Sequence, residues 1–308
     1  MLQFSQELSS GDARLRIDVE GASPCGQVLE TMTFLNYRLA NVVVQPAVTK
    51  PKPDILWLPD RPDKRILYDD IATLQGEWAQ GELQKVVVSL LALRMEEAGL
   101  HPFHSSAIRY RDLSILFIGG ESNHGKSMGQ IEGSRRGALV ISTETTVTDE
   151  NGIAVMGSKS VYLRERAKGT ERADKLDQYQ GVAKFFDEEP VFEYLHEPTN
   201  IDLVILPAID GNFDPKTAQM APFECNYQTY HSLTDYFGMR ELLAPGIPMP
   251  MFDNDVRRIQ RATFCKNFCE RPFYHIRGKN PQVLFDQLEE VLDSDPRFAG
   301  GRIINARG

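Results

Sequence analysis

The sequence predicts an α/β protein. Residues 115–118 and 201–206 are continuous apolar runs, as expected of strands covered on both faces. Residues 82–98 and 281–292 carry apolar side chains at helical spacing. Strand patterns that alternate with helix patterns along one chain are typical of an α/β core.

The composition is that of an ordinary globular protein. The chain has 308 residues, of which 42% are hydrophobic and 25% charged, which is enough for one large domain or two modest ones. The formal net charge of −9 repels phosphate backbones, so we expect no nucleic-acid partner. Any anion that the protein binds must be held by a local site that works against this overall charge.

The cysteines and the termini indicate a reduced, cytoplasmic protein. The four cysteines are not spaced as a disulfide framework: Cys25, Cys225, Cys265 and Cys269. The N-terminal residues lack the basic and apolar regions of a secretory signal. No apolar run is long enough to span a bilayer, so we expect no membrane partner.

The first part of the chain, to about residue 80, is predicted to be mixed. Short extended runs at 41–45 and 55–58 are broken by prolines, which punctuate strands and loops. These prolines are Pro46, Pro51, Pro53, Pro59 and Pro62. The helix at 82–98 then ends at Gly99. We place a soft boundary near Leu100, which separates an N-terminal α/β region of unknown role (1–99) from a second domain (100–308).

The second domain begins with two predicted strands, at 105–109 and 115–118, followed by a glycine-rich loop and a short helix. A third strand at 139–141 precedes a hairpin, whose strands at 145–147 and 153–155 flank a turn at 149–152.

Three further elements complete the prediction. The charged segment 164–175 is interpreted as a solvated loop or a frayed helix. The strand at 201–206 is expected to end at Pro207. The last helix, 281–292, starts with Pro281, which is favoured in a first helical turn.

The strongest motif follows the strand at 115–118 and matches G-x-x-x-x-G-K-[ST] in full. Its residues are Gly120, Glu121, Ser122, Asn123, His124, Gly125, Lys126 and Ser127. Glycine lets the backbone curl with its N–H groups inward, and a helix that starts at Lys126 adds its positive dipole end. Lys126 is expected to reach the β- and γ-phosphates of ATP, and the hydroxyl of Ser127 to ligate Mg²⁺. His124 is an unusual residue inside such a loop.

A kinase also needs a group that takes the proton of the acceptor hydroxyl. His104 opens the strand before the loop, and Thr143 and Glu144 follow the strand after the loop's helix. Both positions are expected at the sheet edge where the phosphates bind. We therefore predict catalytic roles for His104, Glu144 and Lys126, and a metal-side role for Ser127 and Glu144. Asp149 is a possible substitute for the base, although Asp-x-x-Gly is also common turn chemistry.

A family resemblance rests on these residues. The segment His104-Ser105-Ser106-Ala107-Ile108, the P-loop, and Arg136-Gly137-Ala138 before the next strand resemble the nucleotide-binding domain of HPr kinase/phosphorylase and its relatives. Segments 201–207 and 271–274 resemble that group more loosely. The close likeness covers about residues 100–152.

The resemblance implies a fold similar to that of phosphoenolpyruvate carboxykinase. It also implies transfer of phosphate from ATP to a hydroxyl of a protein, a peptide or a small molecule, and self-association by analogy. The family's paired acids fall on Thr143 and Glu144, so the first acid is a threonine here. The signature of the reverse reaction is not recognisable, and the resemblance therefore does not extend to phosphorylase activity or to HPr as the substrate.

Three other patterns in the sequence bear on function. Residues 149–152 match D-x-x-G, but no N-K-x-D motif accompanies them, so a GTPase is disfavoured. Basic residues after the hairpin form either a mobile clamp over phosphate or a solvated face: Arg164, Arg166 and Lys168. Cys265 and Cys269, with His275 nearby, lack the partners of a zinc site and are interpreted as free thiols on a helix face.

Two functions follow. The first is an ATP-dependent kinase with a hydroxyl-bearing acceptor, either a peptide serine or a small metabolite. The second is a nucleotide-gated binding module without phosphotransfer, which the missing first acid motivates.

Overall fold

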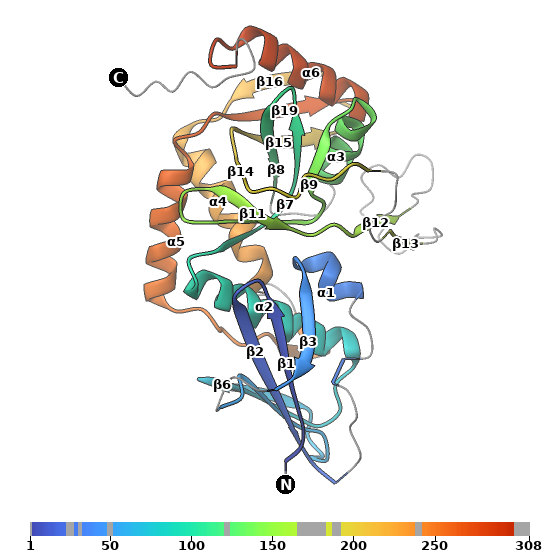
Figure 1. Ribbon diagram of the computed structural model, residues 1–308, viewed down its shortest axis with the longest axis vertical. Helices are drawn as coiled ribbons and strands as arrows, with labels where there is room; N and C mark the ends of the chain where they lie inside the picture. Colours follow the sequence, from blue (N-terminus) through green and yellow to red (C-terminus); the bar gives the residue numbers. More distant parts are fainter. Residues whose placement is uncertain are drawn as a thin grey trace.

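The computed structural model describes residues 2–22, 28–29, 33–47, 52–119, 124–164, 183–186, 192–237 and 242–298. It confirms the predicted α/β class and contains two main mixed sheets, of six and nine strands. In Figure 1 the six-stranded sheet lies toward the N-terminus and the nine-stranded sheet lies above it, with helix α2 between them.

The six-stranded sheet has the order β3-β1-β2-β4-β6-β5. Its strands are β1 (Leu2–Ser10), β2 (Ala13–Glu20), β3 (Val42–Pro46), β4 (Ile55–Leu58), β5 (Arg65–Asp69) and β6 (Ile71–Gln75). Strand β4 is parallel to β2 and to β6, and the other pairs are antiparallel. The runs predicted at 41–45 and 55–58 are therefore β3 and β4, while the long β1–β2 hairpin was not predicted.

Helix α1 (Thr33–Arg38) and helix α2 (Gln80–Glu97) accompany this sheet. The prediction of a helix at 82–98 is confirmed, with a start two residues earlier. Both sides of α2 are buried, because one packs on β2 and the other reaches the segment around Tyr236 and Phe237. One continuous hydrophobic core thus connects the first sheet with the base of the second.

The nine-stranded sheet has the order β14-β11-β10-β7-β8-β15-β19-β16, and β9 also pairs with β7. Its strands are β7 (His101–Tyr110), β8 (Leu113–Ile118), β9 (Leu139–Ser142), β10 (Thr145–Thr148), β11 (Ile153–Gly157), β14 (Thr199–Asn200), β15 (Leu203–Ile209), β16 (Lys216–Gln219) and β19 (Phe273–Gly278). Only the β8–β15 and β15–β19 pairs in this sheet are parallel among the described pairs. All six predicted strands of this region are present.

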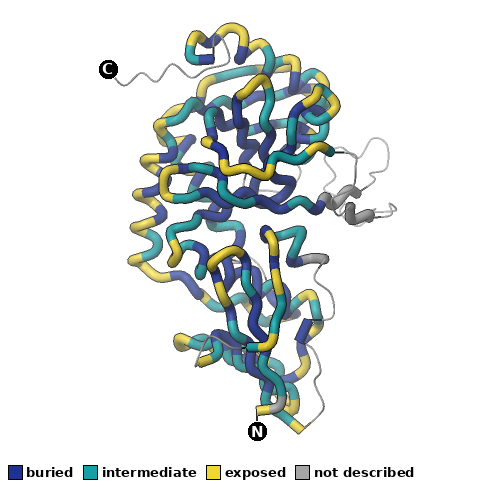
Figure 2. The backbone as a smooth tube through the Cα atoms, in the orientation of Figure 1, coloured by how far each residue is buried: buried dark blue, intermediate teal, exposed yellow. Residues whose placement is uncertain are grey.

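Helices cover both faces of this sheet. On one face α3 (Lys126–Arg135) and α6 (Pro281–Ser294) pack over Ile108, Phe117 and Ile205. On the other, α4 (Pro222–Thr234) and α5 (Asp255–Phe268) pack over a second apolar cluster. The strands of this sheet are mostly buried, whereas α5 alternates buried and exposed residues (Figure 2). The predicted helix at 281–292 is α6.

Smaller elements complete the chain. They are the 3₁₀ turn η2 (Asp235–Phe237), the pair β12 (Val161–Arg164) and β13 (Ala183–Phe186), and the pair β17 (Leu242–Ala244) and β18 (Ile247–Pro248). Arg164, predicted to begin a loop or a frayed helix, ends strand β12 instead. The remainder of segment 164–175 lies outside the described residues.

The prediction that a strand ends at Pro207 was wrong, because β15 continues to Ile209 and pairs Pro207 with Ile276. Strand β8 pairs with β15 only as far as Ile205, so that side of β15 is open at residue 207. Proline, which has no N–H to donate, is tolerated in a strand at such a position.

Candidate functional site

Helix α3 starts at Lys126, as the motif predicts, directly after the loop that follows β8. Gly125 precedes it with φ 107°, a conformation that favours glycine. A Cβ atom at this position would also lie 2.9 Å from Cγ1 of Ile209. The second glycine of the motif is therefore required both by the turn and by the strand beside it.

Gly129 and Gly133 lower the helix propensity of α3, but both are required by packing. A Cβ on Gly129 would lie 3.1 Å from the ring of Phe117, and one on Gly133 would lie 2.6 Å from Cδ1 of Ile108. Glycine costs roughly 1 kcal/mol of helix propensity relative to alanine. The close approach of α3 to the sheet offsets that cost.

Of the predicted nucleotide-binding residues, Gly120, Glu121, Ser122 and Asn123 lie outside the described residues. His124 and Gly125 form a half-buried bend, and Ser127 lies half-buried in the first turn of α3.

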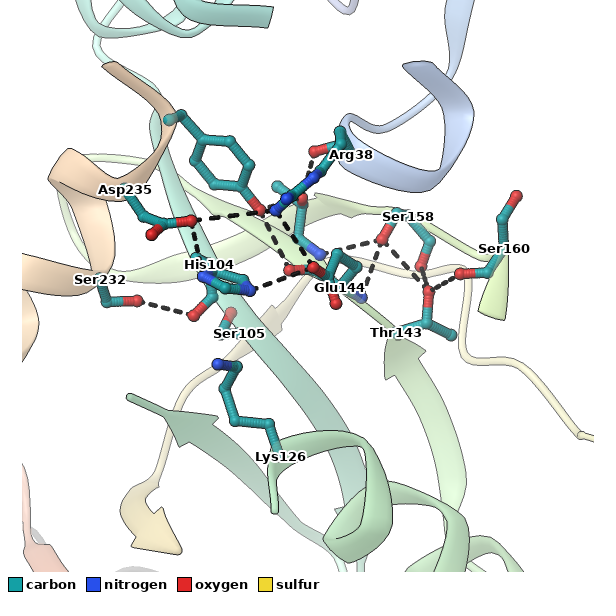
Figure 3. Close-up of polar contacts among 12 residues, drawn as sticks. Arg38, His104, Ser105, Lys126, Thr143, Glu144, Ser158, Ser160, Ser232 and Asp235 are labelled. Atoms are coloured by element: carbon teal, nitrogen blue, oxygen red, sulfur yellow. Dashed lines mark hydrogen bonds and ion pairs between the residues drawn. The ribbon is translucent and has the colours of Figure 1, made fainter. Parts of the chain in front are cut away.

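The side chain of Lys126 points from α3 toward strand β7 and the polar cluster beside it (Figure 3). It is buried, and its ammonium donates a hydrogen bond of 2.7 Å to the carbonyl of Gly119. Burial lowers the pKa of Lys126, and the charges of Glu144 and Asp235 oppose that shift. The ammonium therefore lies in the field of two carboxylates at the start of a helix.

His104 and Glu144 are brought together, although they are 40 positions apart in sequence. His104 Nε2 lies 3.1 Å from Glu144 Oε1, and both side chains are buried. The pairing of β7 with β10 fixes this contact, because it places His104 opposite Thr145, next to Glu144. The backbone N–H of Ser105 also donates to the carbonyl of Glu144 at 3.0 Å.

Asp235 joins this pair and was not singled out from the sequence. Its Oδ2 lies 2.7 Å from His104 Nδ1, on the opposite side of the imidazole from Glu144 (Figure 3). It begins η2, directly after α4. No pattern connects position 235 with the P-loop in sequence, since the contact depends on how α4 packs beside β7.

Arg38 is the second residue that the sequence did not indicate. It ends α1, and its Nη1 lies 3.3 Å from Glu144 Oε1 and 3.9 Å from Asp235 Oδ2. The hydroxyl of Thr145 donates to the Arg38 carbonyl, which fastens the end of α1 to strand β10. The cluster therefore combines α1, which lies beside the six-stranded sheet, with elements of the nine-stranded sheet and its helices. We call His104, Glu144, Asp235, Arg38 and Lys126 the charged cluster.

Both carboxylates of the charged cluster are favoured in their ionised form. Burial raises the pKa of Glu144, but His104, Arg38 and Lys126 outweigh this effect and the net pKa is lowered. Burial likewise raises the pKa of Asp235, and the hydrogen bond and charge of His104, with Arg38 and Lys126, lower it overall. The site thus holds negative charge next to the predicted phosphate-binding lysine.

Thr143 does not belong to the charged cluster. Its hydroxyl lies 2.6 Å from the carbonyl of Ser160 and 3.0 Å from that of Ser158, on the far side of the chain from His104 (Figure 3). Ser158 also accepts hydrogen bonds from the backbone N–H groups of Glu144 and Thr145. Thr143 therefore fixes the bend that carries Glu144.

Asp149 acts as a turn residue. Its Oδ1 accepts hydrogen bonds of 2.9 Å from the backbone N–H groups of Asn151 and Ile153 in the β10–β11 hairpin. This arrangement fits its turn chemistry rather than a role as the base.

The remaining candidates are placed apart from the charged cluster. Arg164 ends β12, and Arg166 and Lys168 lie outside the described residues. Cys265 lies in α5 with Cys269 just after it, and both thiols are free, as predicted. His275 lies on β19. Within the described parts of the chain, no three His, Cys, Asp or Glu side chains are grouped to hold a metal ion.

Comparison of the chain with known protein families finds no match, and comparison with curated proteins finds none. None of the described helices combines the length and apolar composition that a membrane crossing requires. The motif and the charged cluster are therefore the features of this chain that bear on its function.

Proposed function

We propose that the protein is an ATP-dependent kinase that transfers the γ-phosphoryl group to a hydroxyl-bearing acceptor. One observation carries this proposal. Lys126, the lysine of the G-x-x-x-x-G-K-S sequence, lies at the start of α3 in the field of Glu144 and Asp235, which contact opposite nitrogens of His104. Phosphate-binding and proton-accepting groups thus share one site.

The start of α3 fits a polyphosphate. Its first turn contains no acidic residue, so the partial positive charge of the helix end is not compensated within the helix. The buried ammonium of Lys126 exchanges the Gly119 carbonyl for phosphate oxygens when a nucleotide enters. Glycine at 125 leaves room for the chain to turn there.

The residues also fit Mg²⁺, which binds through one or two carboxylates together with substrate phosphates and water rather than in an all-protein cage. The hydroxyl of Ser127 and the carboxylate of Glu144 would hold it. His104 and Arg38 both contact Glu144 at Oε1, and neither of these contacts uses Oε2. When bound, the ion neutralises charge on the phosphates.

The reaction places distinct demands on these residues. As the acceptor oxygen bonds to the γ-phosphorus, the bond to the bridging oxygen breaks, and its electron pair leaves with ADP. Lys126 offsets the negative charge that spreads over the transferred group. The acceptor's proton passes to the charged cluster, in which His104 lies between two carboxylates.

The finer assignments remain part of the proposal. They are a phosphoenolpyruvate-carboxykinase-like, HPr-kinase-like domain at 100–308, an N-terminal α/β region at 1–99 of unknown role, a cytoplasmic location and self-association. The mixed nine-stranded sheet with helices on both faces supports the first of these. The acceptor is a peptide serine or a small metabolite.

The alternative is a nucleotide-gated binding module that transfers no phosphate. It is favoured by Thr143, where the acid expected from the resemblance is replaced by a hydroxyl that points away from His104. In this case Lys126 binds nucleotide, and the ion pair of Arg38 with Glu144 serves as a structural link that the nucleotide loosens.

One experiment separates the two functions. The wild-type chain, with MgATP labelled on the γ-phosphate, is incubated with mixtures of peptides and hydroxyl metabolites, and transferred and released label are measured. We expect label transfer that is lost in Lys126→Ala and retained in Lys266→Ala, a change at an exposed position on α5. ATP binding without transfer or release would contradict the kinase and support the module.

A further inference from the structure

The two carboxylates of the charged cluster differ in their access to solvent. The side chain of Glu144 is 9% exposed, whereas that of Asp235 is 28% exposed. An acceptor hydroxyl that approaches from solvent therefore meets Asp235 before Glu144. Glu144 is enclosed by His104 and Arg38, which both contact its Oε1.

His104 connects the two carboxylates in one line. Its Nδ1 faces Asp235 at 2.7 Å and its Nε2 faces Glu144 at 3.1 Å. An imidazole can carry a proton on either nitrogen or on both, so it can share a proton that arrives at one carboxylate with the other. The more buried carboxylate, Glu144, then fixes the imidazole ring, and the more exposed one, Asp235, remains available to a substrate.

Three hydrogen bonds hold the segment that carries Asp235 in place. Ser232 donates to the carbonyl of His104 at 2.9 Å, and Tyr236 donates to the carbonyl of Glu144 at 3.1 Å. From α2, Ser89 donates to the carbonyl of Tyr236 at 2.8 Å. A catalytic carboxylate requires this kind of support, because a small displacement of the group lowers the rate steeply.

We propose that Asp235 takes the proton of the acceptor hydroxyl, while Glu144 positions His104 behind it. This inference rests on the proposed kinase function and refines the prediction that Glu144 itself is the base. As the acceptor oxygen bonds to the γ-phosphorus, its O–H bond breaks and the proton bonds to a carboxylate oxygen of Asp235. The second acid that is missing at Thr143 is thus supplied from η2.

The test uses the full chain with MgATP alone, because water is itself a hydroxyl acceptor. Phosphate release is measured against pH, and ATP affinity is measured by titration calorimetry. In Asp235→Asn we expect turnover to fall by about 100-fold or more, with ATP affinity nearly unchanged. The acidic limb of the pH–rate profile should disappear. The exposed Asp214→Asn serves as the matched control and should behave as wild type.

Two further variants separate this role from a structural one. Glu144→Gln should lower turnover but retain the acidic limb, because Asp235 still titrates. Asp235→Glu, which keeps a carboxylate, should restore part of the turnover and shift the limb. These outcomes remain informative if Asp235→Asn fails to fold, which circular dichroism would reveal.

Two results would overturn the inference about Asp235, and a third would contradict the kinase function. An acidic limb that survives in Asp235→Asn and is lost in Glu144→Gln would assign the base to Glu144 and overturn the inference. Unchanged turnover in Asp235→Asn would overturn it as well. Wild-type protein that binds ATP but releases no phosphate would instead contradict the proposed function itself.

Discussion

The ammonium of Lys126 donates a 2.7 Å hydrogen bond to the carbonyl of Gly119, so one side chain bridges the two ends of the P-loop. Gly119 follows strand β8, and Lys126 is the first residue of α3. This carbonyl accepts a hydrogen bond from a buried cation. Under the proposed function, phosphate oxygens would take over this contact with Lys126.

The first prediction concerns this lysine. Lys126→Ala should weaken MgATP binding by roughly 10- to 100-fold, since a hydrogen bond to a charged group contributes about 1.5–3 kcal/mol. Titration calorimetry measures the change. The exposed Lys266→Ala should bind as wild type. Equal affinity in Lys126→Ala would place the phosphates elsewhere.

The second prediction concerns Glu144 and acid. Its pKa lies below the ordinary 4.5, so the unfolded chain takes up this proton first as the pH falls. The carboxylate therefore stabilises the fold fully above about pH 4.5, and this stabilisation is lost as the pH falls through the lowered folded pKa. Urea unfolding should show a steeper loss of stability below pH 4.5 in wild type than in Glu144→Gln. Parallel curves would contradict this.

His101 gives a third prediction, in a different pH window. Burial lowers the pKa of His101 from 6.5 to about 4, and its ring stacks on Phe264 with centroids 3.7 Å apart. The unfolded chain therefore binds this proton first, and stability falls by about 3 kcal/mol as the pH drops from 6.5 to 4. The C–H resonances of His101 should titrate near pH 4 in NMR spectra. His101→Phe should remove this part of the pH dependence, and a midpoint near 6.5 would refute the prediction.

A fourth prediction uses two helical glycines. Gly133→Ala should destabilise the protein by about 1–3 kcal/mol, because its Cβ would lie 2.6 Å from Ile108 and 2.9 Å from Phe285. Gly81→Ala in α2 is the matched control, since nothing lies within 4 Å of a Cβ there. It should stabilise by up to about 1 kcal/mol through helix propensity. Thermal unfolding would reveal opposite shifts, and shifts of the same sign would contradict the packing argument.

The fifth prediction concerns Arg261, whose side chain is fully buried. It donates hydrogen bonds to Glu96 at 2.6 and 2.7 Å and to Asp253 at 3.0 and 3.2 Å, and it lies over the ring of Phe237. Arg261→Met leaves two buried carboxylates without this partner and should cost about 3–5 kcal/mol in the free energy of unfolding.

The matched control for Arg261 is Arg258, which also pairs with Asp253 but from a partly exposed position. Arg258→Ala should cost no more than about 1 kcal/mol, because its side chain is partly exposed and the buried Asp253 keeps its hydrogen bonds from Arg261. Similar losses in both variants would show that burial does not govern this network.

Local pattern predicted the elements around the P-loop well. The apolar run of β8, the helix that starts at Lys126 and the hairpin at β10–β11 depend on neighbours in sequence, and all three are present. It also placed His104 and Glu144 at the same sheet edge, and in the structure the pairing of β7 with β10 brings them into contact. The role of each residue remains a prediction.

Long-range packing accounts for what the sequence did not predict. Asp235 contacts His104 because α4 packs beside β7. Arg38 contacts Glu144 because it ends α1, a short helix beside the six-stranded sheet. Neither position has a periodic or motif signal. The β1–β2 hairpin was missed as well, although the apolar residues of β2 (Ala13, Leu15, Ile17 and Val19) alternate with charged ones as expected of a strand.

The contact of Arg38 with Glu144 has a consequence for how this chain can be divided. A fragment that begins at Leu100 would keep the whole P-loop but lose the only arginine of the charged cluster. It would also lose α2, whose Ser89 holds the turn that carries Asp235. The two halves therefore cannot be exchanged between proteins like independent modules, and an engineered fusion must carry both across the junction together.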